Sequence, residues 1–301
     1  MSRPGARLRR ERSLFAAAMM VPTLLWTIIV LVYPVGVAVR SSFYRIGAGF
    51  DPHPPFVGLA NYAALLGDGA FWHSARVTLF FTLGNVAGSF GLGLLTALAL
   101  HQRFAGRSLA RALLLLPWAL PQVAAVVVWK WLLQVQYGAA NYVLWRLHLV
   151  PTPNVQWLVR PSLGLYAVLA ATVWWQYPIA TTFLQAGLAS VPVDLLEAAR
   201  IDGATAWQRF RHVIWPGLRH VRNVLLLMLL FWSLGQVIII WTMTAGGPAR
   251  ATQTLGILVY TRAFTDFQFG SASALGTVVL AAALTLGLLY YRLTLRAAAE
   301  V

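Results

Sequence analysis

The chain has 301 residues, of which 59% are hydrophobic and only 10% are charged. Water-soluble domains carry about 25% charged residues, so this composition predicts an integral membrane protein. The chain has no cysteine, which excludes disulfides, thiolate metal sites and cysteine nucleophiles.

The apolar stretches predict six transmembrane helices. A helix that spans a bilayer needs about 20 mostly apolar residues. Uncharged stretches of this length, or nearly so, cover residues 13–39, 77–100, 112–129, 161–193, 223–249 and 267–291. The third extends past Lys130 to Leu133. The first is longer than the apolar core of a signal peptide, about 7–15 residues, so we expect it to remain as a helix.

The arginines predict the orientation, because cytoplasmic loops accumulate basic residues. With both termini in the cytoplasm, most arginines lie on the inner side and fewer than half as many lie outside. The net charge of +15 then reflects topology, and we expect no nucleic-acid partner. The expected parts are a cytoplasmic basic tail (1–12), the first transmembrane helix (13–39), an external segment (40–76), a core of five helices (77–292) and a cytoplasmic tail (293–301).

The segments between the predicted helices restrict the chemistry. The outer ones are rich in proline and glycine, which predicts irregular surface loops. Within the apolar stretches, acidic residues and histidines are absent except at the ends, which argues against a proton-coupled carrier. Lys130 is expected to snorkel to the membrane interface. It is the only lysine and is followed by Trp131, so a P-loop for ATP is absent. We expect no catalytic residue, no metal site and an energy source on another protein.

The inner segment at about residues 185–222 is the longest on the cytoplasmic side. Pro192 in the first turn and Asp194 as a cap predict a short helix. Gly203 permits the positive φ of a helix end. A second short amphipathic helix is predicted by the apolar spacing of Trp207, Phe210, Val213 and Ile214. A hairpin lying on the bilayer surface is the alternative, although such helices seldom carry acids like those found here.

Several blocks of residues identify a family. The inner segment contains Glu197, Ala198, Ala199, Asp202, Gly203, Ala204, Phe210, Ile214 and Pro216. This pattern resembles the EAA loop of ATP-binding-cassette (ABC) importer permeases, and the resemblance is closest to their maltose-type, carbohydrate-uptake branch. It extends over nearly the whole chain through Tyr33-Pro34, Ser42-Phe43, the run 56–62, Phe71-Trp72, Leu116-Pro117, Pro121, Trp129, Gly246-Gly247-Pro248, Tyr260 and Ala263-Phe264. His220 departs from the family, which often has a second proline there.

The resemblance implies an all-α membrane protein with the type I ABC importer permease fold in a bacterial plasma (inner) membrane. The chain would form half of a pore with a second permease subunit and would not be an enzyme. Two ATPase subunits would carry ATP and Mg²⁺, and an extracytoplasmic binding protein would deliver a sugar; this chain would bind no cofactor. The residues implied in ATPase coupling are Glu197, Ala198, Ala199, Asp202, Gly203 and Ala204. Trp207 and Phe210 would pack against the permease's own helices.

Two stripes are candidates for the substrate pathway, because sugars are bound by aromatic faces together with amide or hydroxyl groups. Helical spacing groups Thr172, Trp175, Gln176 and Ile179 in the fourth stretch, and Leu229, Trp232, Ser233 and Gln236 in the fifth. The resemblance implies sugar contacts at Thr172, Trp175, Gln176, Trp232, Ser233 and Gln236. The alternative is that these side chains join helices to one another. Trp118 and Trp174 are assigned to packing or to the aromatic belt.

Two other functions remain open from the sequence. An importer of the same architecture for another solute, such as a glycerol phosphate ester, would favour a basic group in the cavity, and neither stripe has one. A self-sufficient secondary carrier is opposed by the missing intramembrane acids.

Overall fold

The computed structural model describes residues 18–49, 51–102 and 104–295. In this part of the chain the structure is mostly helical, and extended pairing is confined to a bridge between Tyr44 and Phe56. The described residues form two compact units: residues 18–67 with 261–278, and residues 68–260 with 279–295. The predicted basic tail (1–12) lies outside the described residues, as do residues 296–301 of the predicted C-terminal tail.

The first unit contains the first apolar helix, which runs over Ala18–Ser41. A π-helical turn, Ile28–Val32, interrupts it before α2 (Tyr33–Ser41). None of the side chains in these two elements is buried. This exposed apolar surface is what a helix surrounded by lipid or by other membrane helices requires.

A short helix and an asparagine hold the segment after α2 in place. α3 (Ala60–Leu66) brings the Asn61 amide to the carbonyl oxygens of Ser42 and Tyr44, at 2.8 and 3.0 Å. The hydroxyls of Ser42 and Tyr62 lie 2.6 Å apart. This part of the predicted external segment is therefore ordered, whereas the sequence predicted an irregular loop.

The second unit is built on three long helices: α4 (Gly69–His101), α8 (Pro161–Ala189) and α12 (Arg219–Leu234). α4 begins at Gly69 rather than at Val77, because Asp68 caps it by accepting a hydrogen bond from the Ala70 amide at 2.8 Å.

Small residues let α4 and α8 approach closely. A Cβ added to Gly93 would lie 2.7 Å from the Cβ of Ala180 and 3.1 Å from the backbone nitrogen of Thr181. The hydroxyls of Thr96 and Thr181 lie 2.6 Å apart across the same contact. Small residues at helix crossings allow this packing in lipid, where no hydrophobic effect drives the helices together.

Two apolar clusters form the core of the second unit. One cluster joins α4 and α8 to the shorter helices and contains Phe81, Val126, Leu133, Ala167, Val168, Ala171, Ile239, Ile240, Met243 and Ile257. The other joins α4, α8 and α12 and contains Ala97, Ala180, Leu184, Leu188, Leu218, Leu225 and Leu229.

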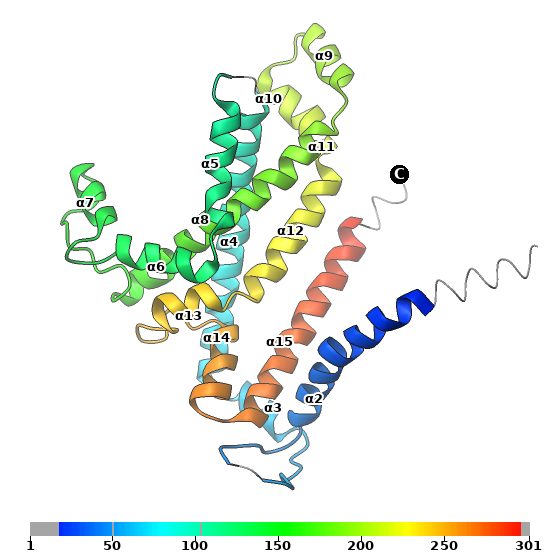
Figure 1. Cartoon of the computed structure of the whole chain (residues 1–301), viewed down its shortest axis with the longest axis vertical. Coiled ribbons are helices and arrows are strands. Elements are labelled where there is room, and N and C mark those ends of the chain that lie inside the picture. Colours follow the sequence, from blue (N-terminus) through cyan, green and yellow to red (C-terminus); the bar gives the residue numbers. More distant parts are fainter. Residues whose placement is uncertain (1–17, 50, 103, 296–301) are drawn as a thin grey trace, which may run out of the picture. The chain divides into compact units, whose positions relative to one another are not determined.

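The third predicted span is not one continuous helix. It consists of α5 (Arg107–Ala119) and α6 (Gln122–Leu132), which meet at an angle of 98°. Leu120 is extended, with ψ of 135°, as expected for a residue before proline, and Pro121 has no amide hydrogen to continue the helix. α6 therefore turns away from the direction of α5. Both α6 and α13 cross the direction of α4 and α5 (Figure 1).

The fifth predicted span, residues 223–249, is also interrupted. α12 ends at Leu234 with Gly235 as its C-cap, and α13 (Ile238–Thr244) follows. Gln236 therefore lies between two helices. The helical stripe predicted through Gln236 is wrong for this residue.

Three helices are long and apolar enough to cross a membrane, judged on the described residues. They are Ala18–Ser41, Gly69–His101 and Phe269–Thr294. The number rises to as many as six if each bent pair is one span: Arg107–Ala119 with Gln122–Leu132, Pro161–Ala189 with Val193–Ile201, and Ala206–Gly217 with Arg219–Leu234. The last helix comprises α15 (Phe269–Tyr290) and a π-helical end, Tyr291–Leu295.

The other segments predicted to lie outside also contain helices that the sequence did not predict. α7 (Ala139–Arg146) lies between α6 and α8, and α14 (Leu255–Tyr260) continues as a π-helical turn, Thr261–Thr265. Asn141 orders the first of these segments, because its carbonyl accepts a hydrogen bond from the Trp157 indole at 2.6 Å and its amide donates to two backbone carbonyls.

Candidate functional site

A cavity of about 340 Å³ lies where the two interrupted helices meet the middle of α8; we call it the aromatic pocket. It is lined by Trp118, Gln122, Trp175, Gln176, Phe231, Trp232, Gly235, Gln236 and Ile238. Irregular backbone at membrane depth is tolerated where it lines a cavity or is covered by protein. The two helix breaks therefore suit the wall of a cavity.

Three tryptophans form one wall of the aromatic pocket. The Trp118 ring centroid lies 4.6 Å from that of Trp175, and 5.9 Å from that of Trp232 at an interplanar angle of 29°. The Trp175 indole donates to the carbonyl of Leu120 at 3.0 Å, which satisfies a backbone acceptor left by the break after α5.

The two remaining tryptophans both make the packing contacts assigned to them. Trp118 packs against Trp175 and Trp232, and it also lines the pocket, which was not predicted. Trp174 packs edge-on against Trp129 at 5.9 Å, in agreement with a packing role.

A buried polar network lies beside the aromatic pocket. The Asn85 amide nitrogen on α4 donates to Oε1 of Gln176 at 2.6 Å and to Oγ of Ser233 at 2.7 Å. The Ser89 hydroxyl donates to the carbonyl oxygen of Asn85 at 3.2 Å. Asn85 is completely buried. Asn85 was not among the residues predicted from the sequence, although an amide within an apolar helix is a signal of a polar partner on another helix.

The six predicted substrate-pathway residues divide into two groups. Trp175, Gln176, Trp232 and Gln236 line the aromatic pocket. Thr172 and Ser233 are not among its lining residues: the Thr172 hydroxyl donates to the Val168 carbonyl at 2.8 Å, and Ser233 belongs to the Asn85 network.

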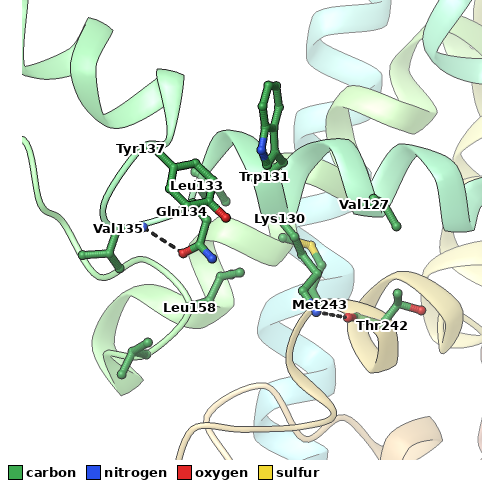
Figure 2. A pocket seen from close by; sticks show the side chains of 11 residues that line it. Val127, Lys130, Trp131, Leu133, Gln134, Val135, Tyr137, Leu158, Thr242 and Met243 are labelled. Carbon is green, nitrogen blue, oxygen red and sulfur yellow. Dashed lines mark hydrogen bonds between the residues drawn. The ribbon is translucent and has the colours of Figure 1, made fainter.

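A second cavity, of about 490 Å³, lies at the opposite ends of α6 and α13 (Figure 2). Within it the Lys130 ammonium donates to the carbonyl of Thr242 at 3.2 Å, and Oε1 of Gln134 accepts the Val135 amide at 3.1 Å. Tyr137 also lines this cavity, and the rest of its wall is mostly apolar. Lys130 is exposed and lies at a cavity next to α13, whereas its snorkelling to the membrane interface stays a prediction.

The loop between α8 and α12 contains the two predicted short helices; we call it the α8–α12 loop. α9 (Val193–Ile201) ends in a left-handed turn in which Gly203 has φ of 75°. The amide of Ala204 bonds to the Ala199 carbonyl at 2.9 Å, and the amide of Gly203 bonds to the Arg200 carbonyl at 3.1 Å. These two bonds are those of a Schellman motif, so the helix end with positive φ predicted at Gly203 is confirmed.

The second helix of the α8–α12 loop is longer than predicted. It comprises α10 (Ala206–Arg209), a π-helical segment (Phe210–Ile214) and α11 (Trp215–Gly217). Its cap is Thr205, whose hydroxyl and amide both bond to Gln208.

The capping prediction for α9 is wrong. The residue at the N-cap is Pro192, which makes no side-chain capping bond, and Asp194 lies in the first turn instead. An acidic residue there still interacts favourably with the helix dipole.

The surface of the α8–α12 loop is exposed and mixed in character. Glu197 is exposed, as are Ile201 (86%) and Trp207 (65%). The Trp207 ring stacks on Phe210 at 5.5 Å, but most of it is not packed against the chain, contrary to the prediction. Phe210 contacts Trp215 at 5.9 Å, as expected for a residue that faces the helical bundle.

Comparisons with known proteins define the family. A family model described as "Binding-protein-dependent transport system inner membrane component" matches residues 89–298. This is more than half of the chain. The chain therefore belongs to the family of inner-membrane permease components of binding-protein-dependent ABC transport systems, which confirms the predicted resemblance.

Relatives with more specific names match almost the whole chain. The trehalose/maltose transport system permease protein MalF of Thermococcus litoralis is 34% identical over 282 residues, covering 93% of this chain and 94% of the relative. The sn-glycerol-3-phosphate transport system permease protein UgpA of Agrobacterium fabrum is 31% identical over 272 residues, covering 90% and 91%.

The fold is shared with a solved transporter. A bacterial alginate ABC transporter in complex with an alginate pentasaccharide-bound periplasmic protein contains a chain that matches with a TM-score of 0.82 and 20% identity, covering 95% of this chain and 96% of that chain. The two chains therefore share one fold.

Proposed function

We propose that this chain is a membrane-spanning subunit of an ABC importer for sugars and that the aromatic pocket holds the sugar during translocation. The observation that carries the proposal is the pocket itself, in which tryptophan faces and glutamine amides meet where two helices are interrupted. Aromatic faces stack on the C–H surfaces of sugars, and amides bond to their hydroxyls.

The chemistry of the pocket favours a neutral sugar over a glycerol phosphate ester. None of the residues that line the aromatic pocket has a charged side chain. A phosphate dianion would enter without a cation to balance it, and moving an unpaired charge out of water is costly. The glycerol phosphate alternative is supported by the name of one relative and by Lys130 in the second cavity.

The proposed topology counts each bent helix pair as one span, which gives six spans with both termini in the cytoplasm of a bacterial cell. Helices α9 and α10 lie at the end of the second unit opposite to α14 (Figure 1), as this topology requires for an inner coupling loop and an outer face. A second permease subunit would complete the pore, and an external binding protein would deliver the sugar.

Coupling is assigned to the α8–α12 loop, whose exposed surface is available to an ATPase subunit. The proposed coupling residues are Glu197, Ala198, Ala199, Asp202, Gly203 and Ala204. Two ATPase subunits would bind ATP and Mg²⁺, and this chain would hold no cofactor or metal. Closure of the ATPases would draw the two loops together and open the pore outward, and hydrolysis would reset it. Glu197 would pair with a basic group of the ATPase.

The test is import by the reconstituted complex with its own ATPase, second permease and binding protein. Trehalose, maltose and sn-glycerol 3-phosphate are compared for ATP-dependent uptake into proteoliposomes and for the rise they cause in the binding protein's Tm. We expect import of a sugar, and Trp175→Ala should reduce it. Import of sn-glycerol 3-phosphate alone, or sugar uptake that does not require ATP, would refute the proposal.

A further inference from the structure

We propose that Asn85 is a positioning residue that holds the Gln176 amide with its nitrogen toward the aromatic pocket, so that this point of the pocket donates a hydrogen bond to the sugar. The inference rests on the proposed function, because it names what that pocket recognises. It assigns a role to a residue of α4 that does not line the pocket.

The donor and acceptor roles in this network follow from Ser233 on α12. The Ser233 hydroxyl has one proton, which it donates to the Leu229 carbonyl at 2.7 Å. Its oxygen can then only accept from Asn85, which approaches at 2.7 Å. The Asn85 atom that faces Ser233 is therefore the amide nitrogen, and the Ser89 hydroxyl occupies the opposite side by donating to the Asn85 carbonyl oxygen.

The same nitrogen sets the orientation of Gln176. Because Asn85 presents a donor, the Gln176 atom 2.6 Å away is the acceptor Oε1. The NH₂ group of Gln176 is then the part of the amide that remains for the pocket. Gln176 is 2% exposed and lines the aromatic pocket, and the described residues offer no hydrogen-bond acceptor to its nitrogen. The Gln176 nitrogen is not among the fully buried polar atoms that lack a partner, so it is accessible from the pocket, where an acceptor on the solute can bond to it.

This arrangement makes a prediction about the sugar that stacking alone does not make. If the pocket donates a hydrogen bond at Gln176, the sugar oxygen at that position acts as the acceptor. The proton of that sugar hydroxyl then makes no hydrogen bond to Gln176. Replacing the hydroxyl by fluorine keeps an acceptor, whereas replacing it by hydrogen removes both functions. The two replacements therefore separate a donating pocket from an accepting one.

The experiment measures KM for import of maltose and trehalose and of their monodeoxy and monofluoro analogues, using the reconstituted complex. For the unmodified chain we expect one hydroxyl position at which the deoxy analogue raises KM about tenfold while the fluoro analogue stays within about threefold, with kcat nearly unchanged. Equal losses for the fluoro and deoxy analogues at every position would refute a donating Gln176.

The variants test whether Asn85 sets this preference. In Asn85→Asp the carboxylate accepts only, so Gln176 turns its oxygen toward the pocket, and the fluoro analogue should become as poor as the deoxy analogue. In Asn85→Leu the amide is no longer held and the difference between the analogues should shrink. The control is Thr96→Val, which removes a part-buried hydrogen bond from the same α4–α8 contact and should keep the unmodified order.

Retention of the unmodified order in Asn85→Asp and Asn85→Leu would refute the positioning role while leaving sugar import intact. Absence of sugar import by the unmodified complex would instead refute the proposed function.

A measurement on the unmodified complex decides the inference even if the variants do not assemble. In nanodiscs, with ¹⁵N-labelled glutamine assigned by comparison with Gln176→Met, the Gln176 amide protons should exchange rapidly with water and broaden with a soluble gadolinium chelate. Protected protons would show that the amide nitrogen faces Asn85 and would refute the inference.

Discussion

Replacement of Gly203 by leucine tests whether the α8–α12 loop couples this chain to an ATPase. Gly203 adopts φ of 75°, and a Cβ built on it meets no atom within 4 Å. A side chain at this position therefore causes no steric clash within the chain. The intrinsic cost of the left-handed conformation is about 1–2 kcal/mol for a residue with a Cβ, and it is smaller for asparagine, which visits this region more readily.

The magnitude follows from these two values. If an ATPase must bind the loop in this turn, Gly203→Leu should weaken its binding by about five- to thirtyfold from strain alone, since 1.4 kcal/mol is a factor of ten. Contact between leucine and the ATPase would add to this loss. Gly203→Asn should weaken ATPase binding less than Gly203→Leu if backbone strain dominates. It should weaken binding as much as Gly203→Leu if the ATPase lies directly against this position.

The assay is retention of the ATPase during a detergent wash series, together with ATP-dependent import. Each variant complex should still insert and pair with the second permease, because no contact within the chain is disturbed. Glu197→Ala should act in the same direction, because a partner cation would be left unpaired at the interface. Parental ATPase retention and import in both Gly203→Leu and Glu197→Ala would refute the coupling role of the loop.

Three further predictions concern topology, the pocket and packing. Cysteines placed at Asp68 and Gln208 should be labelled from opposite sides of the membrane, Asp68 from outside; labelling from one side would contradict the six-span topology. Gln236→Ala should raise KM for sugar import without loss of the ATPase, and unchanged import would return Gln236 to a structural role. Gly93→Ala should lower the Tm of the complex relative to Gly91→Ala, because overpacking costs about 1–3 kcal/mol of stability. A Cβ at Gly93 would meet Ala180 at 2.7 Å, whereas a Cβ at Gly91 would meet no atom within 4 Å. Equal Tm values would contradict the close packing of α4 and α8.

Features that depend on neighbouring residues in the chain could be predicted from the sequence. The long apolar stretches, the turn at Gly203 and the pattern around Glu197 each follow from composition or from the conformational preferences of a few consecutive residues. The left-handed turn is set by the geometry of one helix end, so no distant residue is needed to predict it.

The positions of the helix breaks required the tertiary structure. Pro178 lies inside the continuous helix α8, whereas the helix ends before Pro121. A proline removes one backbone hydrogen bond in either place. At the break before Pro121, the indole of Trp175, far along the chain, takes the carbonyl of Leu120.

The aromatic pocket was likewise decided by contacts between distant residues. Trp175 and Gln176 were predicted from helical spacing, but Gln236 reaches the pocket because α12 ends before it, and Trp118 does so at the end of α5. Asn85 meets its partners from α8 and α12 only when three helices pack together. Helical periodicity relates residues within a few turns of one helix. A buried polar group needs a hydrogen-bond partner, and the packing of helices decides which distant residue supplies it.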